Sequence, residues 1–313
     1  MGSKHTFRFG VQCGGEHTRE SWRALAHQIE DLGYSTMYTP DHFVDTVLAP
    51  MTALAMAAEA TTTLRVGALV FDNDYKHPAI LAKEAATIDL LCDGRLELGI
   101  GAGWMRTDYD QLGLPYDPPA VRVDRFEEAL HIVKQCFTGE QFTYHGEHYR
   151  ITDYASWPRP VQQPGPPLLI GGGGKRVLSV AAREADIVGI NPNLRAGEIG
   201  LDAAQDSLRE QTNRKVQWIR EAAGPRIADI EIQMRFFITS VRPDRMKLAE
   251  ALAPTFGVSP EEALESGAAL VGTEDEITEQ LHRRREEWGL SYIVVGDDNV
   301  DEFAPIVAKL ART

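Results

Sequence analysis

Four consecutive glycines, Gly171–Gly174, lie between a short apolar run and a helical pattern that begins with Lys175 and Arg176. Glycine loses more backbone freedom on folding than any other residue, so a run of four is expected to serve a purpose. Backbone N–H groups at a helix start bind anions, because they are unpaired and the helix dipole is positive there. The run predicts a phosphate site, to which Lys175 and Arg176 would add charge. A close passage of the chain between strand and helix is the competing interpretation.

Asp41 and His42 form a second candidate site, because they follow a predicted strand at Thr36–Thr39. An imidazole can give or take a proton near neutral pH. Asp41 could orient this imidazole or hydrogen-bond a bound cofactor. We therefore predict that His42 and Asp41 are catalytic. The alternative is that the pair only caps the turn after the strand.

Other candidate residues are less specific. His145 and His148 have an HxxH spacing, but they lack an obvious carboxylate partner, so no metal site is predicted. Four aromatic residues could wall a substrate cavity or pack an insertion against the core: Trp104, Tyr109, Tyr154 and Trp157.

Strands and helices that alternate along the chain must position these residues. Short apolar runs predict eight strands: Phe7–Gln12, Thr36–Thr39, Leu64–Val70, Leu96–Ile100, Leu168–Ile170, Asp186–Ile190, Glu231–Ile238 and Ser291–Val295. Apolar residues at helical spacing predict helices between the strands. Glycines mark the ends of several of these helices. The last predicted helix of the chain is Asp301–Leu310.

Eight such units in 313 residues are typical of an α/β fold of the TIM (β/α)8 barrel type. A doubly wound open sheet is the alternative, and it would need fewer strands or a second domain. We predict a single domain over residues 1–313. Residues at about 140–167 are rich in Pro, Gly and aromatic side chains, which predicts an insertion near the barrel mouth. Both candidate sites follow strands, where the active sites of such barrels lie.

The composition limits the possible partners. The chain has 46 acidic and 32 basic residues and a net charge of -14, which disfavours binding to nucleic acid and to anionic membranes. The sequence shows neither a signal peptide nor an apolar run long enough to span a membrane, so we expect a cytoplasmic protein. Its three cysteines, Cys13, Cys92 and Cys136, are far apart and are expected to be reduced thiols.

Longer stretches resemble the bacterial luciferase-like flavin and deazaflavin oxidoreductases. They are "DHF" at 41–43, "HPAILAKEAATIDLLCDGRLELGIGAGW" at 77–104, "PRPVQQPGPPLLIGGGGKRVLSVAAREADIVGI" at 158–190 and "LVGTEDEITEQL" at 270–281. The resemblance implies a TIM barrel with a flavin-type ring at the strand C-termini and the cofactor phosphate on Gly171–Gly174. It also implies a cis peptide bond without proline at Ala68 and Leu69.

The resemblance assigns a set of residues to the cofactor. They are Asp41, His42, Ala68, Leu69, Val70, Ala102, Gly103, Trp104, Gly171, Gly172, Gly173, Gly174 and Lys175. It also implies a homodimer and a small-molecule substrate.

The identity of the cofactor depends on the loop after the fourth strand. Flavin-dependent relatives place an arginine there to hold the FMN phosphate, and this position matches Ala102. The closer resemblance is to the branch that uses the deazaflavin coenzyme F420, which implies hydride transfer without oxygen activation. Sugar-phosphate dehydrogenases of that branch carry an acid where this chain has Trp104, so their substrate does not carry over.

Three alternatives remain open. The first is an FMN-dependent luciferase-like monooxygenase. The second is a flavoprotein that binds cofactor without turnover. The third is a barrel isomerase or lyase that holds a substrate phosphate on the glycine run, but no essential carboxylate or lysine is evident for it.

Overall fold

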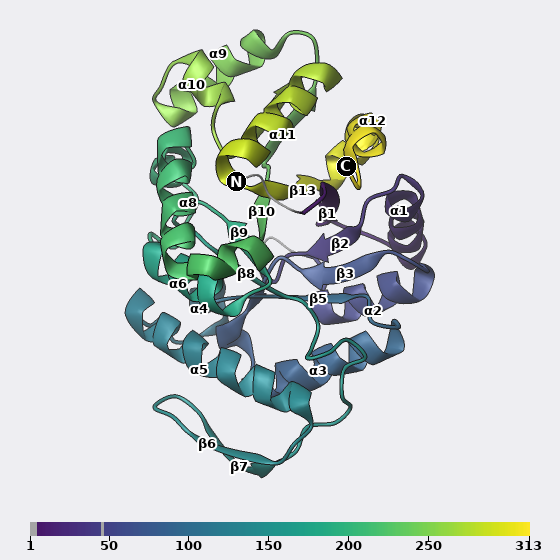
Figure 1. Cartoon of the computed structure of the whole chain (residues 1–313), viewed down its shortest axis with the longest axis vertical. Helices are drawn as coiled ribbons and strands as arrows, with labels where there is room; N and C mark the ends of the chain where they lie inside the picture. Colours follow the sequence, from purple (N-terminus) through teal and green to yellow (C-terminus); the bar gives the residue numbers. More distant parts are fainter. Residues whose placement is uncertain (1–4, 45–46) are drawn as a thin grey trace.

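The computed structural model describes residues 5–44 and 47–313, and within them a closed parallel barrel is surrounded by helices (Figure 1). The barrel strands are β1 Arg8–Gln12, β2 Thr36–Thr39, β3 Arg65–Ala68, β5 Leu96–Gly101, β8 Leu168–Gly172, β9 Ile187–Ile190, β10 Glu231–Arg235 and β13 Leu290–Gly296. They pair in the order β3-β2-β1-β13-β10-β9-β8-β5, and a β3–β5 pairing closes the ring. A two-residue strand, β4 Phe71–Asp72, extends the β5 edge.

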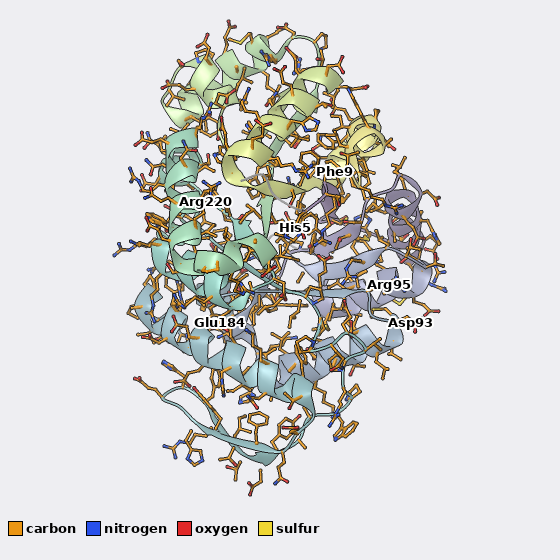
Figure 2. The ribbon with its side chains drawn as sticks, viewed as in Figure 1. His5, Phe9, Asp93, Arg95, Glu184 and Arg220 are labelled. Atoms are coloured by element: carbon orange, nitrogen blue, oxygen red, sulfur yellow. The ribbon has the colours of Figure 1, made fainter. Side chains whose placement is uncertain are left out.

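The helices form a layer around the barrel. The longer ones are α1 Arg19–Asp31, α2 Pro50–Ala60, α3 Pro78–Leu91, α5 Pro119–Thr138, α6 Lys175–Glu184, α8 Arg209–Ala223, α9 Arg245–Phe256, α11 Glu274–Trp288 and α12 Val300–Leu310. The shorter ones are α4 Arg106–Leu112, α7 Leu201–Asp206, α10 Pro260–Leu264 and the 3-10 turns Asn73–Tyr75, Gly224–Asp229 and Asp297–Asn299. Their polar faces are solvated, as exposed Arg220 on α8 illustrates (Figure 2).

The structure confirms the TIM-barrel prediction, and each of the eight predicted strands coincides with a barrel strand. One predicted strand divides, however. Glu231–Ile238 is interrupted, because β10 ends at Arg235 and Ile238 begins β11 Ile238–Val241, which pairs with β12 Ala269–Gly272. Helices α9 and α10 connect β11 to β12. Sequence analysis did not predict this excursion or its two four-residue strands.

The predicted insertion at 140–167 contains the hairpin β6 Phe142–His145 and β7 Arg150–Tyr154. It runs along the outside of the barrel, because α5 returns the chain to the opposite end from the mouth. Its tip reaches the mouth side, where Asn73 donates a hydrogen bond of 3.3 Å to Tyr149. Its exit lies at the far end, where Gln162 donates to the carbonyl of Leu96 at 2.8 Å.

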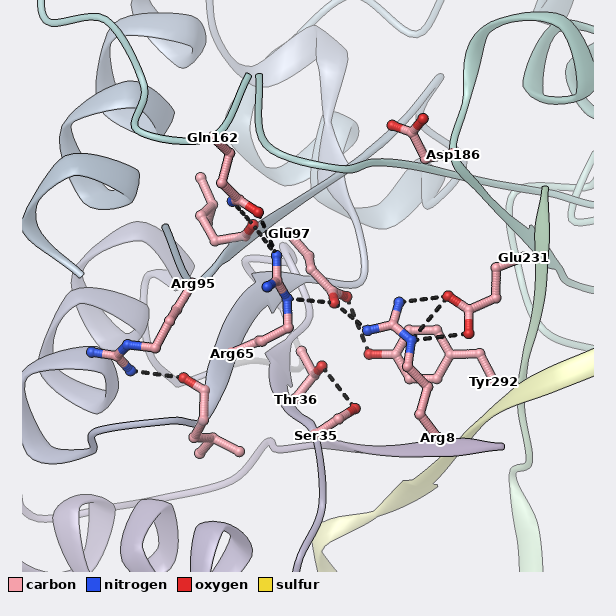
Figure 3. Close-up of polar contacts among 12 residues, drawn as sticks. Arg8, Ser35, Thr36, Arg65, Arg95, Glu97, Gln162, Asp186, Glu231 and Tyr292 are labelled. Carbon is pink, nitrogen blue, oxygen red and sulfur yellow. Dashed lines mark hydrogen bonds and ion pairs between the residues drawn. The ribbon is translucent and has the colours of Figure 1, made fainter. Parts of the chain in front are cut away.

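Charged side chains close the N-terminal end of the barrel (Figure 3). Glu97 on β5 is fully buried and accepts hydrogen bonds from Arg8 at 2.5 Å and from Arg65 at 2.9 Å. Arg8 also contacts Glu231 at 2.7 Å. Since these residues lie at or next to the first positions of β1, β3, β5 and β10, we define Arg8, Arg65, Glu97 and Glu231 as the floor cluster.

Two further expectations concern the whole chain. The three cysteines are free and buried in the structure, as expected for reduced thiols. Among the described residues, every helix is too short or too polar to cross a membrane.

Candidate active site

Leu69 and Val70 lie at the mouth of the barrel, directly beyond β3. They pack on an interior cluster that includes Tyr38 and Tyr292. Gly101 leaves room for Val70, because a Cβ there would lie 2.8 Å from its Cγ2. Gly171 adjoins the same side chain, at 3.5 Å from its Cγ1. Glycines on β5 and β8 thus allow Val70 to cover the centre of the mouth.

The cis peptide bond without proline joins Leu69 and Val70. The predicted position, Ala68 and Leu69, is therefore wrong by one residue. Strand β3 ends at Ala68, but the Leu69 N–H still donates to the Thr39 carbonyl at 2.9 Å, so the cis bond follows this last contact with β2. Both residues of the cis bond are in the predicted cofactor set.

His42 lies at the mouth beyond β2, as predicted, and its imidazole is held by a residue that sequence analysis missed. His42 Nδ1 lies 2.8 Å from Asp108 Oδ2 on α4. Asp108 also accepts from the Phe43 N–H at 2.9 Å and from the Tyr75 hydroxyl at 2.9 Å. The expectation that Asp41 orients the imidazole is wrong, because Asp41 accepts instead from the Asp72 N–H at 3.1 Å.

The Asp108 carboxylate fixes the tautomer of His42. Burial alone would raise the pKa of Asp108, but hydrogen bonds from His42, the Phe43 backbone and Tyr75 outweigh it and lower the pKa. An ionised carboxylate only accepts hydrogen bonds, so Nδ1 of His42 donates and Nε2 is the nitrogen left for a ligand. The His42 side chain is 22% exposed, whereas that of Asp108 is fully buried. This arrangement suits a positioned acid or base.

Asp41 and Asp72 form a buried pair of carboxyl groups beside the histidine. Burial raises the pKa of both groups, and the pKa of Asp72 reaches about 8. Tyr109 donates to Asp72 at 3.1 Å. Gly103 is required here, because it has a φ of +76° and a Cβ would lie 2.8 Å from the Asp72 carboxylate. A buried carboxyl group whose pKa lies near neutrality is typical of functional sites.

The glycine run ends β8 and leads into α6. Part of it is explained by packing, as the competing interpretation holds. A Cβ on Gly172 would lie 2.6 Å from Val177 Cγ1, and one on Gly173 would collide with the Pro192 carbonyl. Gly174 has no such reason to be glycine, because a Cβ there would meet only Asn193 Nδ2, at 4.0 Å.

Gly174 occupies the N-cap of α6, and no side chain caps this helix start. The first N–H groups of a helix need acceptors, so an uncapped start at the barrel mouth suits a phosphate. Exposed Lys175 adjoins it. Arg176 does not serve as predicted, because it pairs with Asp124 on α5 at 2.5 Å and with Glu127 at 3.4 Å. The donor set present therefore fits a phosphate ester.

The loop after β5 carries the remaining predicted residues. Half-buried Trp104 packs edge-on against His42, with ring centroids 5.3 Å apart, so it lies beside the histidine. Ala102 packs against the core. Arg106 stacks over the Tyr116 ring at 4.7 Å.

The other aromatic candidates divide. Tyr109 is fully buried beneath the mouth. Tyr154 packs on Phe142 within the hairpin, and Trp157 stacks with Arg159. Tyr154 therefore packs within the insertion, whereas Trp157 is 59% exposed. The described residues contain no group of His, Cys, Asp and Glu that could hold a metal ion, and this includes His145 and His148.

A guanidinium on the opposite side of the mouth was also missed. Arg235, the last residue of β10, donates to Gln12 Oε1 at 3.0 Å, and Gln12 donates to the Leu69 carbonyl at 3.0 Å. Burial lowers the pKa of Arg235 to about 10, so it remains a cation at neutral pH. Its position inside a long predicted strand gave no signal of this role.

Comparison with known proteins identifies related enzymes. A family model described as luciferase-like monooxygenase matches residues 1–292. An F420-dependent glucose-6-phosphate dehydrogenase from Nakamurella multipartita is 27% identical over 273 residues, covering 82% of this chain and 77% of the relative. An FMNH2-dependent dimethylsulfone monooxygenase from Pseudomonas putida is 29% identical over 201 residues, covering 61% of this chain but only 54% of the relative.

A solved structure extends the similarity of fold to nearly the whole chain. The F420-dependent tetrahydromethanopterin reductase from Methanopyrus kandleri superposes with a TM-score of 0.78 at 18% identity, covering 98% of both chains. The relatives thus include users of F420 and users of reduced FMN. The family match runs through the barrel and its mouth, and on this ground the chain belongs to the luciferase-like monooxygenase family.

Proposed function

We propose that this protein is an F420-dependent oxidoreductase that transfers hydride between the deazaflavin and a small organic substrate. The observation that carries the proposal is the uncapped start of α6 at Gly174, which follows the fifth barrel strand at the mouth. No side chain caps the N–H groups of this helix start, so they suit a phosphate as their acceptor. Membership in the luciferase-like family supports a flavin-type group as its carrier.

The choice of F420 over FMN rests on the loop after β5. Ala102 stands where flavin-dependent relatives place an arginine, and the nearest arginine along the loop, Arg106, stacks on Tyr116. One phosphate-binding cation is thus missing for FMN. Because relatives of both kinds match the chain, the affinities for F420 and FMN distinguish the two cofactors.

The residues at the mouth have distinct proposed tasks. Leu69, Val70 and Trp104 would contact the ring, and Gly174 and Lys175 would hold the phosphate. The bound deazaflavin supplies hydride chemistry. Val70 excludes water from the barrel interior, and Arg235 supplies positive charge at the mouth.

His42 is proposed to move the proton that accompanies hydride transfer. Hydride removal from an alcohol leaves a proton on oxygen, and Nε2 of His42 is the nitrogen left to accept it. Asp108 holds Nδ1 and stabilises the resulting imidazolium. Asp41 and Asp72 shape the wall beside it.

We also propose that the enzyme acts as a cytoplasmic homodimer, an expectation supported by the family resemblance. Sedimentation velocity of the purified chain measures the oligomeric state directly. A monomer at micromolar concentration would contradict it.

A spectroscopic titration tests the proposed function. The purified protein is titrated with F420 and with FMN, and binding is followed by absorbance and fluorescence. We expect micromolar or tighter binding of F420 and weaker binding of FMN. Tighter binding of FMN would favour a monooxygenase. Binding of neither would favour an isomerase or lyase.

Turnover is tested separately with a panel of alcohols and sugar phosphates, by following the absorbance of F420 as it is reduced. We expect at least one compound to reduce the bound coenzyme. Tight F420 binding with no reduction by any of them, and no oxidation of reduced F420 by the corresponding carbonyl compounds, would favour a binding protein without turnover.

A further inference from the structure

Lys215 is a buried cation behind the glycine run. It lies on α8, and its side chain is only 2% exposed. Its ammonium donates to the Asn191 carbonyl at 2.9 Å and to the Asp206 carbonyl at 2.8 Å, and it also pairs with the Asp206 carboxylate. Burying an ammonium is costly unless it is paired and hydrogen-bonded, so this one is held by a built set of partners.

The partners of Lys215 belong to the segment that follows β9. Lys215 donates to the Asn191 carbonyl, at the start of residues 191–193. The Asp206 carboxylate accepts from the Asn193 N–H at 2.6 Å, at the end of these three residues. The ion pair therefore grips residues 191–193 from both ends, and Pro192 lies between them.

Residues 191–193 in turn form the back wall of the glycine run. The Asn191 N–H donates to the Gly172 carbonyl at 2.9 Å. The Pro192 carbonyl fills the place where a side chain on Gly173 would lie, and the Asn193 amide is the nearest group to Gly174. A displacement of this segment would thus move the glycines directly.

We propose that Lys215, with Asp206, is a positioning residue for the cofactor phosphate. The pair holds residues 191–193 against Gly172–Gly174 and so fixes the N–H groups at the start of α6. Lys215 itself does not contact the phosphate, because its ammonium is occupied by Asn191 and Asp206. This inference rests on the proposed function, in which that helix start binds the phosphate.

The test compares ligands that differ only in the phosphate. FMN and riboflavin form one pair, and 5-deaza-FMN and 5-deazariboflavin form a second. Their dissociation constants are measured by fluorescence titration, and the pair that binds the wild type more tightly is used. For Lys215→Met we expect the phosphate advantage, the ratio of the two affinities, to fall about tenfold or more. Affinity for the ligand without phosphate should stay within about threefold.

Two further variants make the test specific. Asp206→Asn removes the charge but keeps an oxygen for the Asn193 N–H, so it should reduce the phosphate advantage in the same direction but less. Lys134→Met is the matched control, because Lys134 donates to the Glu184 carbonyl at 2.9 Å and pairs with its carboxylate at 2.7 Å at the other end of α6. The control should keep the wild-type ratio. Circular dichroism establishes that each variant is folded.

The outcomes separate this inference from the proposed function. An unchanged phosphate advantage in folded Lys215→Met or folded Asp206→Asn would overturn the role of Lys215. If Lys215→Met does not fold, Asp206→Asn alone decides. A wild-type protein that binds both members of each pair equally would instead remove the phosphate site, and the inference with it.

Discussion

The two ends of the barrel bury carboxyl groups in opposite ways. At the N-terminal end, burial would raise the pKa of Glu97, but Arg8 and Arg65 outweigh it and lower the pKa. At the mouth, no cation among the described residues pairs with Asp72, and burial raises its pKa to about 8. The floor cluster is therefore balanced by its own charges. The mouth keeps a carboxyl group that is costly to ionise. Such a group is typical of a functional site, whereas a balanced set of ion pairs is typical of a structural one.

The largest expected effect comes from breaking the floor cluster. Glu97→Gln removes the negative charge that joins Arg8 to Arg65 in this cluster. Arg8 keeps its contact with Glu231, whereas half-buried Arg65 loses its carboxylate partner. Removing one member of a buried ion pair costs about 3–5 kcal/mol, so we expect the free energy of unfolding to fall by that amount in urea denaturation. A loss below about 1 kcal/mol, the value for an exposed ion pair, would mean that the floor cluster is not a stabilising element.

The next effect concerns rate rather than stability. His42→Ala should lower the rate of F420 reduction by about 10² or more, because general acid–base catalysis is lost, and should leave F420 affinity within about tenfold. The rate is measured with whichever alcohol or sugar phosphate the wild type oxidises. His131→Ala is the control, since His131 packs on Tyr144 outside the barrel. If His42→Ala turns over at the wild-type rate, His42 only caps the turn after β2 and does not take part in catalysis.

The smallest effect is a gain in stability at the mouth. The folded pKa of Asp72, about 8, lies above the ordinary value of 3.8, so unfolding releases a proton between these pH values. The resulting destabilisation is absent below about pH 4, grows with pH and is complete above about pH 8. Asp72→Asn removes it. We expect the stability advantage of the variant over the wild type to increase by at least about 1.4 kcal/mol from pH 6 to pH 8.

Urea denaturation of both proteins at the two pH values measures this difference. A pH-independent difference would show that Asp72 is ionised with ease, and the contrast between the two barrel ends would lose its basis.

The features that sequence predicted are those encoded by short local patterns. Apolar runs located the barrel strands, and the position of His42 after Thr36–Thr39 located the mouth. The Gly171–Gly174 run marked the helix start. Such signals survive because strand burial and helix starts depend on neighbouring residues.

The features that sequence missed depend on contacts between distant segments. Asp108 reaches His42 across 66 positions, and in the sequence it resembles an ordinary acid in the first turn of a short helix. Arg176 pairs with α5 instead of a phosphate because Asp124 lies beside it only in the fold. The role of Lys215 likewise requires the segment 191–193 to fold back on the glycine run.

The central claim is that the mouth binds the cofactor through the start of α6 while the floor cluster only stabilises the barrel. The most direct test is one F420 titration of wild type, Gly174→Val and Glu97→Gln, with each affinity expressed per folded molecule. A Cβ on Gly174 would meet only Asn193 Nδ2, at 4.0 Å, so valine should cover the helix start without a clash at its Cβ. We predict that Gly174→Val weakens F420 binding about tenfold or more and that folded Glu97→Gln binds as the wild type does. Equal F420 affinity in Gly174→Val and the wild type would contradict the account.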